Sequence, residues 1–485
     1  MDCRTLSERT THDYSILSAT HLDADGETAA RCRVIGVLPP EIVFGVVLPD
    51  AWNGRILMNG NGGYAGSSPD SPARRRRSDS VASRGFVAVS TNTGHDRQAE
   101  PLGTFALNNR QKEIDYSFRA VHLTIQTARE LVELYYGRPP NYTYWQGCST
   151  GGRQGLMAAQ RFPRDFDGIV VGAPVLNFTD TQIWGAWNAR ALGETPISLR
   201  KMGVVASAVY ERCDAIDGLR DGLLEDPRRC GFDPARDLPR CRDEASKDCF
   251  SQAEVDTLAR IYGGVKSRGE TLFPGLPLGS EAAPPSGRRR LSGWNGWIIS
   301  EEGPSRQEVF AETFFRYLAF EPDEPDFNWR EFDFDADPHR MEFIRSILDA
   351  TDPDLTRFRD AGGRMLMYFG WADTALNPMM GVNYYEDVLA VTGPQTRDFY
   401  RLFMVPGMFH CGGGLGVSTA DYLGALMDWV EQGTVPDRIS AARAIGGRIE
   451  MTRPLCPFPE VAQYDGSGDP NSEDSFECVD PSPRR

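Results

Sequence analysis

A serine in a glycine-rich pentapeptide is the first residue whose type and setting suggest chemistry. Residues 147–151 read Gly-Cys-Ser-Thr-Gly and match the pattern G-x-S-x-G, with Ser149 at its centre. The glycines suit a sharp strand-to-helix turn, where a serine hydroxyl stands exposed and larger neighbours would collide. We therefore predict that Ser149 is a nucleophile. An ordinary glycine-rich turn between a strand and a helix is the alternative interpretation.

A serine hydroxyl is a weak nucleophile at neutral pH and needs a neighbouring base. His410 is the candidate, because it follows an apolar run typical of a strand and directly precedes a cysteine. His95 also follows such a run and could line the site, but it precedes the serine in the chain. The other histidines lie in polar segments, in a helical pattern or in an inserted segment: His12, His21, His122 and His339.

The third member of such a triad is a carboxylate that orients the imidazole. On α/β scaffolds it lies between the serine and the histidine in the chain, on a loop after a strand. The apolar run at 365–369 is followed by Gly-Trp-Ala-Asp, so Asp373 is the candidate. Asp387 and Asp398 are alternatives, but the first lies in a helical pattern and the second before a strand.

Two cysteines suggest how the serine and the histidine could be brought together. Cys148 directly precedes Ser149, and Cys411 directly follows His410. A disulfide between them would hold their Cα atoms about 5.5 Å apart, so that the hydroxyl and the imidazole would be neighbours. Such pre-positioning favours an intramolecular reaction. The alternative is that the two cysteines pair elsewhere.

An ester or amide attacked by a serine passes through an oxyanion, which needs two backbone N–H donors. One should come from Thr150, directly after the nucleophile. The other should come from the glycine-rich loop at 60–63, which follows an early strand pattern. Gly62 and Gly63 are both candidates, and the sequence leaves the choice between them open.

The elements that must position these residues alternate between strand and helix. This alternation predicts a mostly parallel sheet covered by helices on both faces. Strands are predicted at 31–38, 42–48, 55–58, 86–90, 142–146, 169–171, 365–369 and 399–405, and helices at 120–136, 152–162, 380–389 and 420–431.

The alternation of strands and helices stops after Pro174, which predicts an inserted segment. We expect a first core part at 1–176, a lid domain at 177–355 and a second core part at 356–485, whose tail after Cys456 is a loop held by a disulfide. Trp294 and Trp297 lie on a glycine-rich stretch of the lid and are candidates for a flat aromatic pocket. The arginine runs at 74–77 and 288–290 are expected to be solvated, although one arginine of the second run could meet a substrate carboxylate.

Composition excludes some partners. The 485 residues include 52 basic and 68 acidic side chains, a net charge of −16 that disfavours nucleic acid. No apolar run approaches the roughly 18 residues of a membrane span.

Ten cysteines, an even number, indicate disulfides and an oxidising compartment, although a cytosolic protein with ten buried thiols is the alternative. The chain opens without a signal-peptide pattern, so we interpret it as a mature secreted or periplasmic protein whose export signal has been removed.

Three motifs together carry a resemblance to a known family. Residues 147–153, 370–373 and 406–411 resemble those of the tannase and feruloyl esterase family, which includes a bacterial terephthalate-monoester hydrolase. The resemblance implies an α/β-hydrolase fold with a large lid, a serine esterase mechanism without an organic cofactor, and the Cys148–Cys411 bridge. Taken in chain order, the remaining pairs are then expected to be Cys3–Cys32, Cys213–Cys230, Cys241–Cys249 and Cys456–Cys478.

An acidic segment follows Cys213. It carries Asp214, Asp217 and Asp221, and from charge spacing alone both a metal site and a solvated turn are possible. The resemblance implies a structural Ca²⁺ site in the lid, which uses these three carboxylates and the carbonyl groups of Leu219 and Leu223.

Taken together, the sequence predicts a serine carboxylic-ester hydrolase that acts on small esters of phenolic acids such as ferulate or gallate. A terephthalate-monoester hydrolase is the alternative within this class. A catalytically idle protein that binds phenolics or carbohydrates is the alternative from another class. A metallo-hydrolase is disfavoured because no H-E-x-x-H motif is present. The sequence carries no signal for an oligomeric state.

Overall fold

The computed structural model describes residues 2–242, 247–281 and 293–481, and the chain divides into two compact units. Unit 1 comprises residues 1–176, 316–325 and 343–365, and unit 2 comprises residues 177–315, 326–342 and 366–485. The expected division into 1–176, 177–355 and 356–485 stays a prediction.

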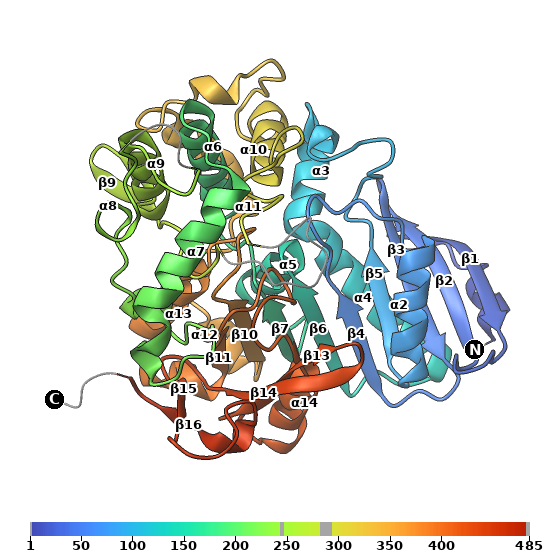
Figure 1. The fold of residues 1–485 in the computed structure, drawn as a ribbon. Helices are drawn as coiled ribbons and strands as arrows, with labels where there is room; N and C mark the ends of the chain where they lie inside the picture. Colours follow the sequence, from blue (N-terminus) through green and yellow to red (C-terminus); the bar gives the residue numbers. More distant parts are fainter. Residues whose placement is uncertain (1, 243–246, 282–292, 482–485) are drawn as a thin grey trace. The chain divides into compact units, whose positions relative to one another are not determined.

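Seven neighbouring strands form the centre of unit 1 (Figure 1), in the order β1-β2-β3-β5-β4-β6-β7. The pairs β1–β2, β2–β3 and β3–β5 are antiparallel. The strands β5, β4, β6 and β7 run parallel to one another. The strands are β1 (Ser15–Leu22), β2 (Arg31–Leu38), β3 (Ile42–Pro49), β4 (Arg55–Asn59), β5 (Val87–Thr91), β6 (Tyr142–Cys148) and β7 (Gly168–Gly172).

Helices cover both faces of this sheet. Figure 1 shows α2 (Pro72–Ser83) in front of the strands and α4 (Ala120–Tyr136) behind them. The apolar spacing that predicts a helix at 120–136 is confirmed, and the helix ends where Gly137 takes a left-handed φ of 73°. Unit 1 also contains α1 (Cys3–Leu6), α3 (Arg110–Ile114), α5 (Thr150–Arg161) and α12 (Thr356–Asp360), and α11 (Glu342–Leu348) starts one residue before its segment 343–365.

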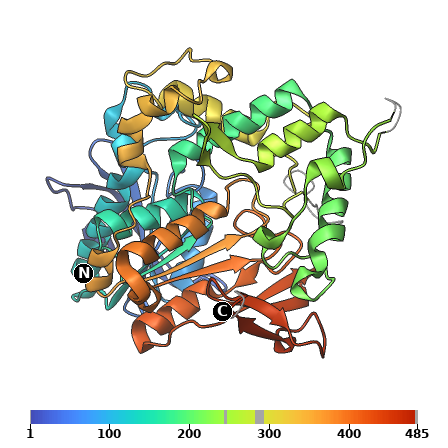
Figure 2. The ribbon, with the colours of Figure 1, turned by 90° about the vertical axis from the view of Figure 1, so that its left-hand side faces the viewer.

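Unit 2 contains two neighbouring strands, β10 (Arg364–Gly370) and β11 (Tyr400–Val405), which Figure 2 shows side by side in orange. Residues 364 and 365 of β10 belong to unit 1. The helices of unit 2 are α6 (Phe178–Glu194), α7 (Leu199–Cys213), α8 (Pro234–Asp237), α9 (Gln252–Tyr262), α10 (Arg306–Tyr317), α13 (Met379–Thr392) and α14 (Tyr422–Gln432), although residues 316 and 317 of α10 belong to unit 1. A small hairpin joins β8 (Val265–Ser267) to β9 (Glu270–Phe273).

The C-terminal part of unit 2 differs from the prediction. The tail after Cys456 is not only a loop, because β15 (Val461–Tyr464) and β16 (Phe476–Val479) pair antiparallel within it. A second small sheet precedes it, made of β12 (Thr419–Ala420), β13 (Ile439–Ile445) and β14 (Arg448–Leu455). The strands β13 to β16 are partly exposed, so they lack the continuous apolar run that reveals a buried strand.

Four disulfides match the predicted pairs. They join Cys3 to Cys32, Cys213 to Cys230, Cys241 to Cys249 and Cys456 to Cys478, with Cα–Cα distances of 5.6, 5.3, 4.9 and 5.6 Å. The first lies in unit 1 and the others in unit 2.

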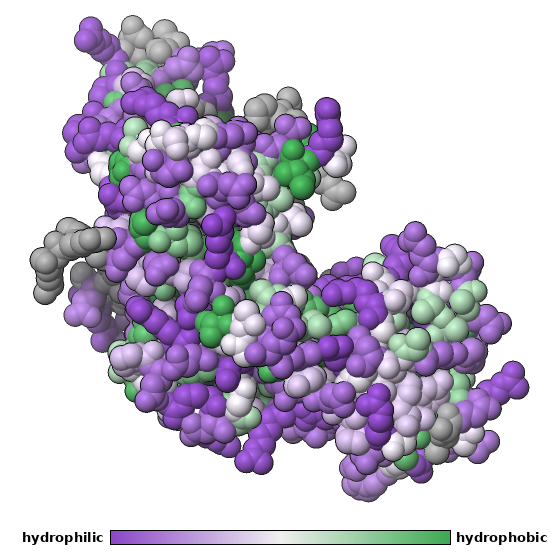
Figure 3. Space-filling view, turned by 90° about the horizontal axis from the view of Figure 1, so that it is seen from below, coloured by the Kyte–Doolittle hydropathy of each residue, from purple (hydrophilic) through white to green (hydrophobic). Residues whose placement is uncertain are grey.

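The face drawn in Figure 3 is mainly hydrophilic, with hydrophobic residues scattered over it. In the described part of the chain, every helix is too short or too polar to cross a membrane.

Candidate active site

Ser149 lies on a strained turn between β6 and α5. Its φ and ψ of 64° and −126° are unusual for a residue with a side chain, and such strain is typical of a nucleophile elbow. The Ser149 N–H donates to the Gly172 carbonyl oxygen at 2.9 Å, which ties the turn to the end of β7. The hydroxyl-bearing residue therefore stands at the carboxyl end of the parallel strands, directly before the N-terminus of α5.

Close backbone packing explains the glycines around the serine. A Cβ atom on Gly147 would lie 2.5 Å from the Gly151 carbonyl oxygen. A Cβ atom on Gly60 would lie 2.6 Å from the Gly151 Cα and 3.1 Å from the Gly147 Cα. The loop after β4 is thus seated directly on the turn that carries Ser149, and only glycine fits at these contacts.

The N–H groups of this loop can be assigned one by one. The Gly60 N–H donates to the Gln146 carbonyl oxygen at 3.0 Å, and the Asn61 N–H donates to Gln154 Oε1 at 3.1 Å. Among the residues that the structure describes, the N–H groups of Gly62 and Gly63 donate to no other group. These two glycines therefore remain the candidates for the second oxyanion donor. Thr150, the first residue of α5, offers the other N–H at the positive end of the helix dipole.

His410 and Asp373 form a close pair in unit 2. The imidazole Nδ1 lies 2.8 Å from Asp373 Oδ2. Because Nδ1 faces the carboxylate, it carries the proton, and Nε2 is left as the basic nitrogen. The structure thus brings together the predicted base and the predicted acid.

Backbone donors hold the Asp373 carboxylate in place. Its side chain is 0% exposed, and Oδ1 accepts the N–H groups of Ala375 at 2.9 Å and of Leu376 at 3.0 Å. These bonds leave Oδ2 directed at the imidazole. The loop after β10 is in turn tied to the loop after β11, because the Ala372 N–H donates to the Met408 carbonyl oxygen at 3.2 Å.

The two halves of the predicted triad belong to different units. Ser149, Thr150 and the loop at 60–63 lie in unit 1, whereas Asp373 and His410 lie in unit 2. The meeting of Ser149 with His410 therefore stays a prediction. Cys148 and Cys411 are both disulfide-bonded, and their pairing with each other, across the same division, also stays a prediction.

A sequence profile of the family described as "Tannase and feruloyl esterase" matches residues 27–479. The chain belongs to this family. It is 34% identical to the mono(2-hydroxyethyl) terephthalate hydrolase of Piscinibacter sakaiensis, over 95% of this chain and 85% of that protein. It is also 30% identical to feruloyl esterase B of Aspergillus niger, over 89% of this chain and 82% of that protein.

The fold agrees with that of a solved member of the tannase and feruloyl esterase family. The crystal structure of feruloyl esterase B from Aspergillus oryzae superposes with a TM-score of 0.85 at 26% identity, and covers 99% of this chain and 100% of that chain. The predicted α/β-hydrolase fold is therefore confirmed.

Two other histidines of the chain, His95 and His122, are involved in packing. His95 is buried and stacks on Phe105, with ring centroids 4.0 Å apart. Burial lowers the pKa of His95 to about 4, so the ring is neutral at physiological pH. His122 bonds to Asp165 at 2.8 Å and stacks on Phe162.

The two predicted pocket tryptophans have different surroundings. Trp297 is half-buried and meets His410 edge-to-face, with ring centroids 5.7 Å apart. Trp294 is 1% exposed, and its indole N–H donates to Ser280 Oγ at 3.0 Å. Its ring packs against Tyr262 in unit 2, and its role in a substrate pocket stays a prediction.

Sequence reasoning missed Arg74. The run at 74–77 was expected to be solvated, and Arg75 and Arg76 are indeed exposed. Arg74 instead turns inward, and its guanidinium donates to the Gly60 carbonyl oxygen at 3.3 Å and to Asn61 Oδ1. No pattern within the run distinguishes this residue, although its place three residues into the helix that follows the glycine loop could have suggested a contact. The run at 288–290 lies outside the described residues.

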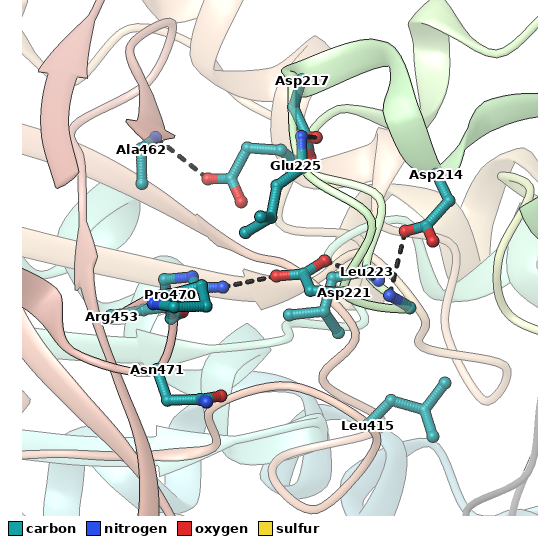
Figure 4. Close-up of polar contacts among 12 residues, drawn as sticks. Asp214, Asp217, Asp221, Leu223, Glu225, Leu415, Arg453, Ala462, Pro470 and Asn471 are labelled. Atoms are coloured by element: carbon teal, nitrogen blue, oxygen red, sulfur yellow. Dashed lines mark hydrogen bonds and ion pairs between the residues drawn. The ribbon is translucent and has the colours of Figure 1, made fainter. Parts of the chain in front are cut away.

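The acidic segment after α7 forms a compact turn in unit 2 (Figure 4). Each of its three aspartates accepts a backbone N–H from within the segment, at 2.9 Å for Asp214, 3.0 Å for Asp217 and 3.1 Å for Asp221. Burial, reinforced by the charges of Asp221 and Asp214, raises the pKa of Asp217 to about 6. The donors bound are the N–H groups of Gly222, Leu219 and Leu223.

This turn has the donor chemistry of a Ca²⁺ site but not its closed geometry. Carboxylate and carbonyl oxygens are the ligands that Ca²⁺ takes, and a divalent cation would offset the mutual repulsion of the aspartates. Within the described residues, no three acidic, histidine or cysteine side chains are gathered as they would be around a metal ion. Arg453 contacts one of the carboxylates, that of Asp221.

Proposed function

We propose that this chain is a serine carboxylic-ester hydrolase that cleaves esters of aromatic acids such as ferulate or gallate. The observation that carries the proposal is the pair of His410 with the fully buried Asp373, which leaves Nε2 as a base. Ser149, on its strained turn before α5, supplies the nucleophile that such a base serves.

The proposed reaction is acyl transfer to water. Ser149 Oγ attacks the ester carbonyl carbon while His410 Nε2 takes the hydroxyl proton. The N–H groups of Thr150 and of Gly62 or Gly63 stabilise the negative charge on the carbonyl oxygen. The alcohol leaves with the proton from His410, and a water activated by His410 then releases the acid from the serine. The Trp297 ring, edge-to-face with His410, supplies an aromatic wall for the acyl group.

A terephthalate monoester is the second candidate substrate, and one observation favours it. The free carboxylate of such an ester needs a cation near the acyl site. The Arg306 guanidinium carbon lies 5.3 Å from the centroid of the Trp297 ring. The relative that is a mono(2-hydroxyethyl) terephthalate hydrolase, at 34% identity, adds to this support.

One experiment tests both substrate classes. Wild type, Ser149→Ala and Arg306→Gln are assayed on methyl ferulate, methyl gallate and mono(2-hydroxyethyl) terephthalate, and labelled with a fluorophosphonate. We expect turnover and labelling to disappear in Ser149→Ala. If ferulate or gallate is the natural class, Arg306→Gln keeps its turnover of those esters. If the terephthalate monoester is the natural substrate, Arg306→Gln loses turnover of mono(2-hydroxyethyl) terephthalate selectively. Wild type that neither turns over an ester nor takes the label would refute the esterase and favour an idle binding protein.

We further propose that the acidic turn holds a structural Ca²⁺. Asp214, Asp217 and Asp221 would supply carboxylate oxygens, and Leu219 and Leu223 would supply carbonyl oxygens. The ion would lend rigidity to the turn and take no part in the acyl transfer, because Ser149 and His410 carry out all proton and acyl movements.

We also propose that the protein works in an oxidising compartment, as a secreted or periplasmic enzyme. Its disulfides support this location, since such bonds are rare in reducing cytosol.

A further inference from the structure

The carbonyl group of Gly63 is bound by two side-chain hydroxyls. Thr150 Oγ1 donates to this oxygen at 2.6 Å, and the Tyr116 hydroxyl donates to it at 3.0 Å. Both donors are buried, each 1% exposed. A carbonyl oxygen has two lone pairs, so both acceptor positions of this oxygen are filled. The peptide group after Gly63 therefore has a fixed orientation.

The peptide group before Gly63 is fixed as well. Its carbonyl oxygen, that of Gly62, accepts the Ala65 N–H at 3.0 Å. A trans peptide is planar, and its N–H points opposite to its C=O. The Gly63 N–H must therefore point away from Ala65. Gly63 also has a φ of 56°, which glycine adopts without the steric cost that other residues would meet.

The start of the loop is held by a charged side chain. Arg74 donates to the Gly60 carbonyl oxygen and to the side-chain oxygen of Asn61. Gln154, on α5, accepts the Asn61 N–H. Burial, with smaller contributions from Arg77 and Arg97, lowers the pKa of Arg74 to about 10, so the guanidinium is charged at neutral pH. Helices α2 and α5 thus each contribute a side chain that ties down the beginning of the loop.

We propose that Tyr116, the Thr150 hydroxyl and Arg74 are positioning residues of the oxyanion site. Each of them donates a hydrogen bond to the loop at 60–63. Together they hold the loop so that the N–H groups of Gly62 and Gly63, which donate to no other group that the structure describes, face the developing oxyanion. Donors that are already oriented need no reorganisation during the reaction, and this is what makes them effective. This inference rests on the proposed function, because it assumes attack by Ser149.

The test removes one oxygen atom at a time. Tyr116→Phe and Thr150→Val each delete a hydroxyl and keep the side-chain shape, whereas Thr150→Ser keeps the hydroxyl. On methyl ferulate, we expect Tyr116→Phe and Thr150→Val to lower kcat about tenfold, less than the hundredfold or more that follows loss of an oxyanion donor itself. KM should change little, and Thr150→Ser should retain most of the wild-type kcat. Equal kcat values for Thr150→Val and Thr150→Ser would overturn the inference.

A second readout separates positioning from general stability. Phenylboronic acid forms a tetrahedral adduct with an active-site serine, so its inhibition constant reports the oxyanion site. We expect this constant to rise in Tyr116→Phe by the same factor by which kcat falls. A lower melting temperature with an unchanged inhibition constant would mean that the hydroxyl only stabilises the fold, and the inference would be wrong.

Arg74 has a matched control on its own helix. Arg74→Gln should lower kcat, whereas Arg76→Gln, at an exposed position of α2, should not. If Arg74→Gln does not fold, Tyr116→Phe decides the question. Fluorophosphonate labelling of wild type separates this inference from the proposed function. Labelled wild type with unaffected variants refutes only the positioning residues, and wild type without label or turnover refutes the esterase mechanism on which they depend.

Discussion

The Asp373 carboxylate has each of its oxygens assigned to a different task. Oδ1 is occupied by two backbone N–H groups, and Oδ2 faces His410 Nδ1 at 2.8 Å. Because the two oxygens have different tasks, replacing Asp373 with an asparagine of the same shape should disturb one task and keep the other. An asparagine could keep the two backbone bonds through its carbonyl oxygen, but it would offer His410 an NH₂ group and no negative charge.

We therefore expect Asp373→Asn to fold normally and to lose activity. The imidazole would be driven to the wrong tautomer, and the cation formed during attack would lose its partner, so kcat should fall by about 10³-fold or more. Steady-state kinetics on methyl ferulate, with a thermal melt as a folding check, measures this. Asp387→Asn is the control, because Asp387 is exposed on α13. A similar loss in Asp387→Asn, or near-normal turnover in Asp373→Asn, would contradict the assignment.

At this scale, the sequence revealed the residues that stand in recognisable local patterns. Ser149 was recognisable from its flanking glycines, and Asp373 and His410 from their places after apolar runs. Tyr116 and Arg74 could not be found in the same way. The role of Tyr116 depends on a contact with a loop that is distant in sequence. The role of Arg74 depends on which of four consecutive arginines turns inward. Only the packing of the helices on the loop decides such contacts.

At the scale of elements, the buried strands and helices around the site were predictable. The strand expected at 142–146 and the helix expected at 152–162 correspond to β6 and α5, with differences of two residues at most. Long apolar runs and glycine turns mark such elements, because their packing leaves little freedom of composition. The strands β13 to β16 were missed because their partly exposed residues follow no comparably clear pattern.

The acidic turn after α7 gives a prediction at the same scale. Three carboxylates that repel one another should destabilise the turn without a cation and stabilise it with one. We expect EDTA to lower the melting temperature of the protein and added Ca²⁺ to restore it, with a stabilisation of about 2.7 kcal/mol when the ion is at 100 times its Kd.

Asp217→Asn sharpens this test. In EDTA the variant should be at least as stable as wild type, because a repulsive charge has gone. In Ca²⁺ it should be the less stable of the two, because a ligand has gone. Asp233→Asn is the control, since Asp233 accepts a backbone N–H in a similar turn but is exposed. A melting temperature of wild type that is insensitive to both EDTA and Ca²⁺ would rule out the site.

At the scale of the whole molecule, the proposed catalysis requires that residues from two compact units meet. The predicted nucleophile and oxyanion loop belong to unit 1, and the predicted base and its carboxylate belong to unit 2. The sequence offers one covalent means of joining them, the predicted bridge between Cys148 and Cys411, each of which adjoins a catalytic candidate. Holding two reacting groups together accelerates a reaction by removing the entropy of their encounter.

The double variant Cys148→Ser/Cys411→Ser should therefore lose activity through misplacement of His410 relative to Ser149. We expect kcat to fall at least about tenfold, since small misplacements of reacting groups are costly. The control is Cys241→Ser/Cys249→Ser, which removes a disulfide between cysteines only 8 residues apart and should leave kcat nearly unchanged. Peptide mapping without reduction should recover Cys148 and Cys411 in one linked fragment. A fragment that links either cysteine to another partner, or a fully active double variant, would show that the two halves of the site are held together by packing alone.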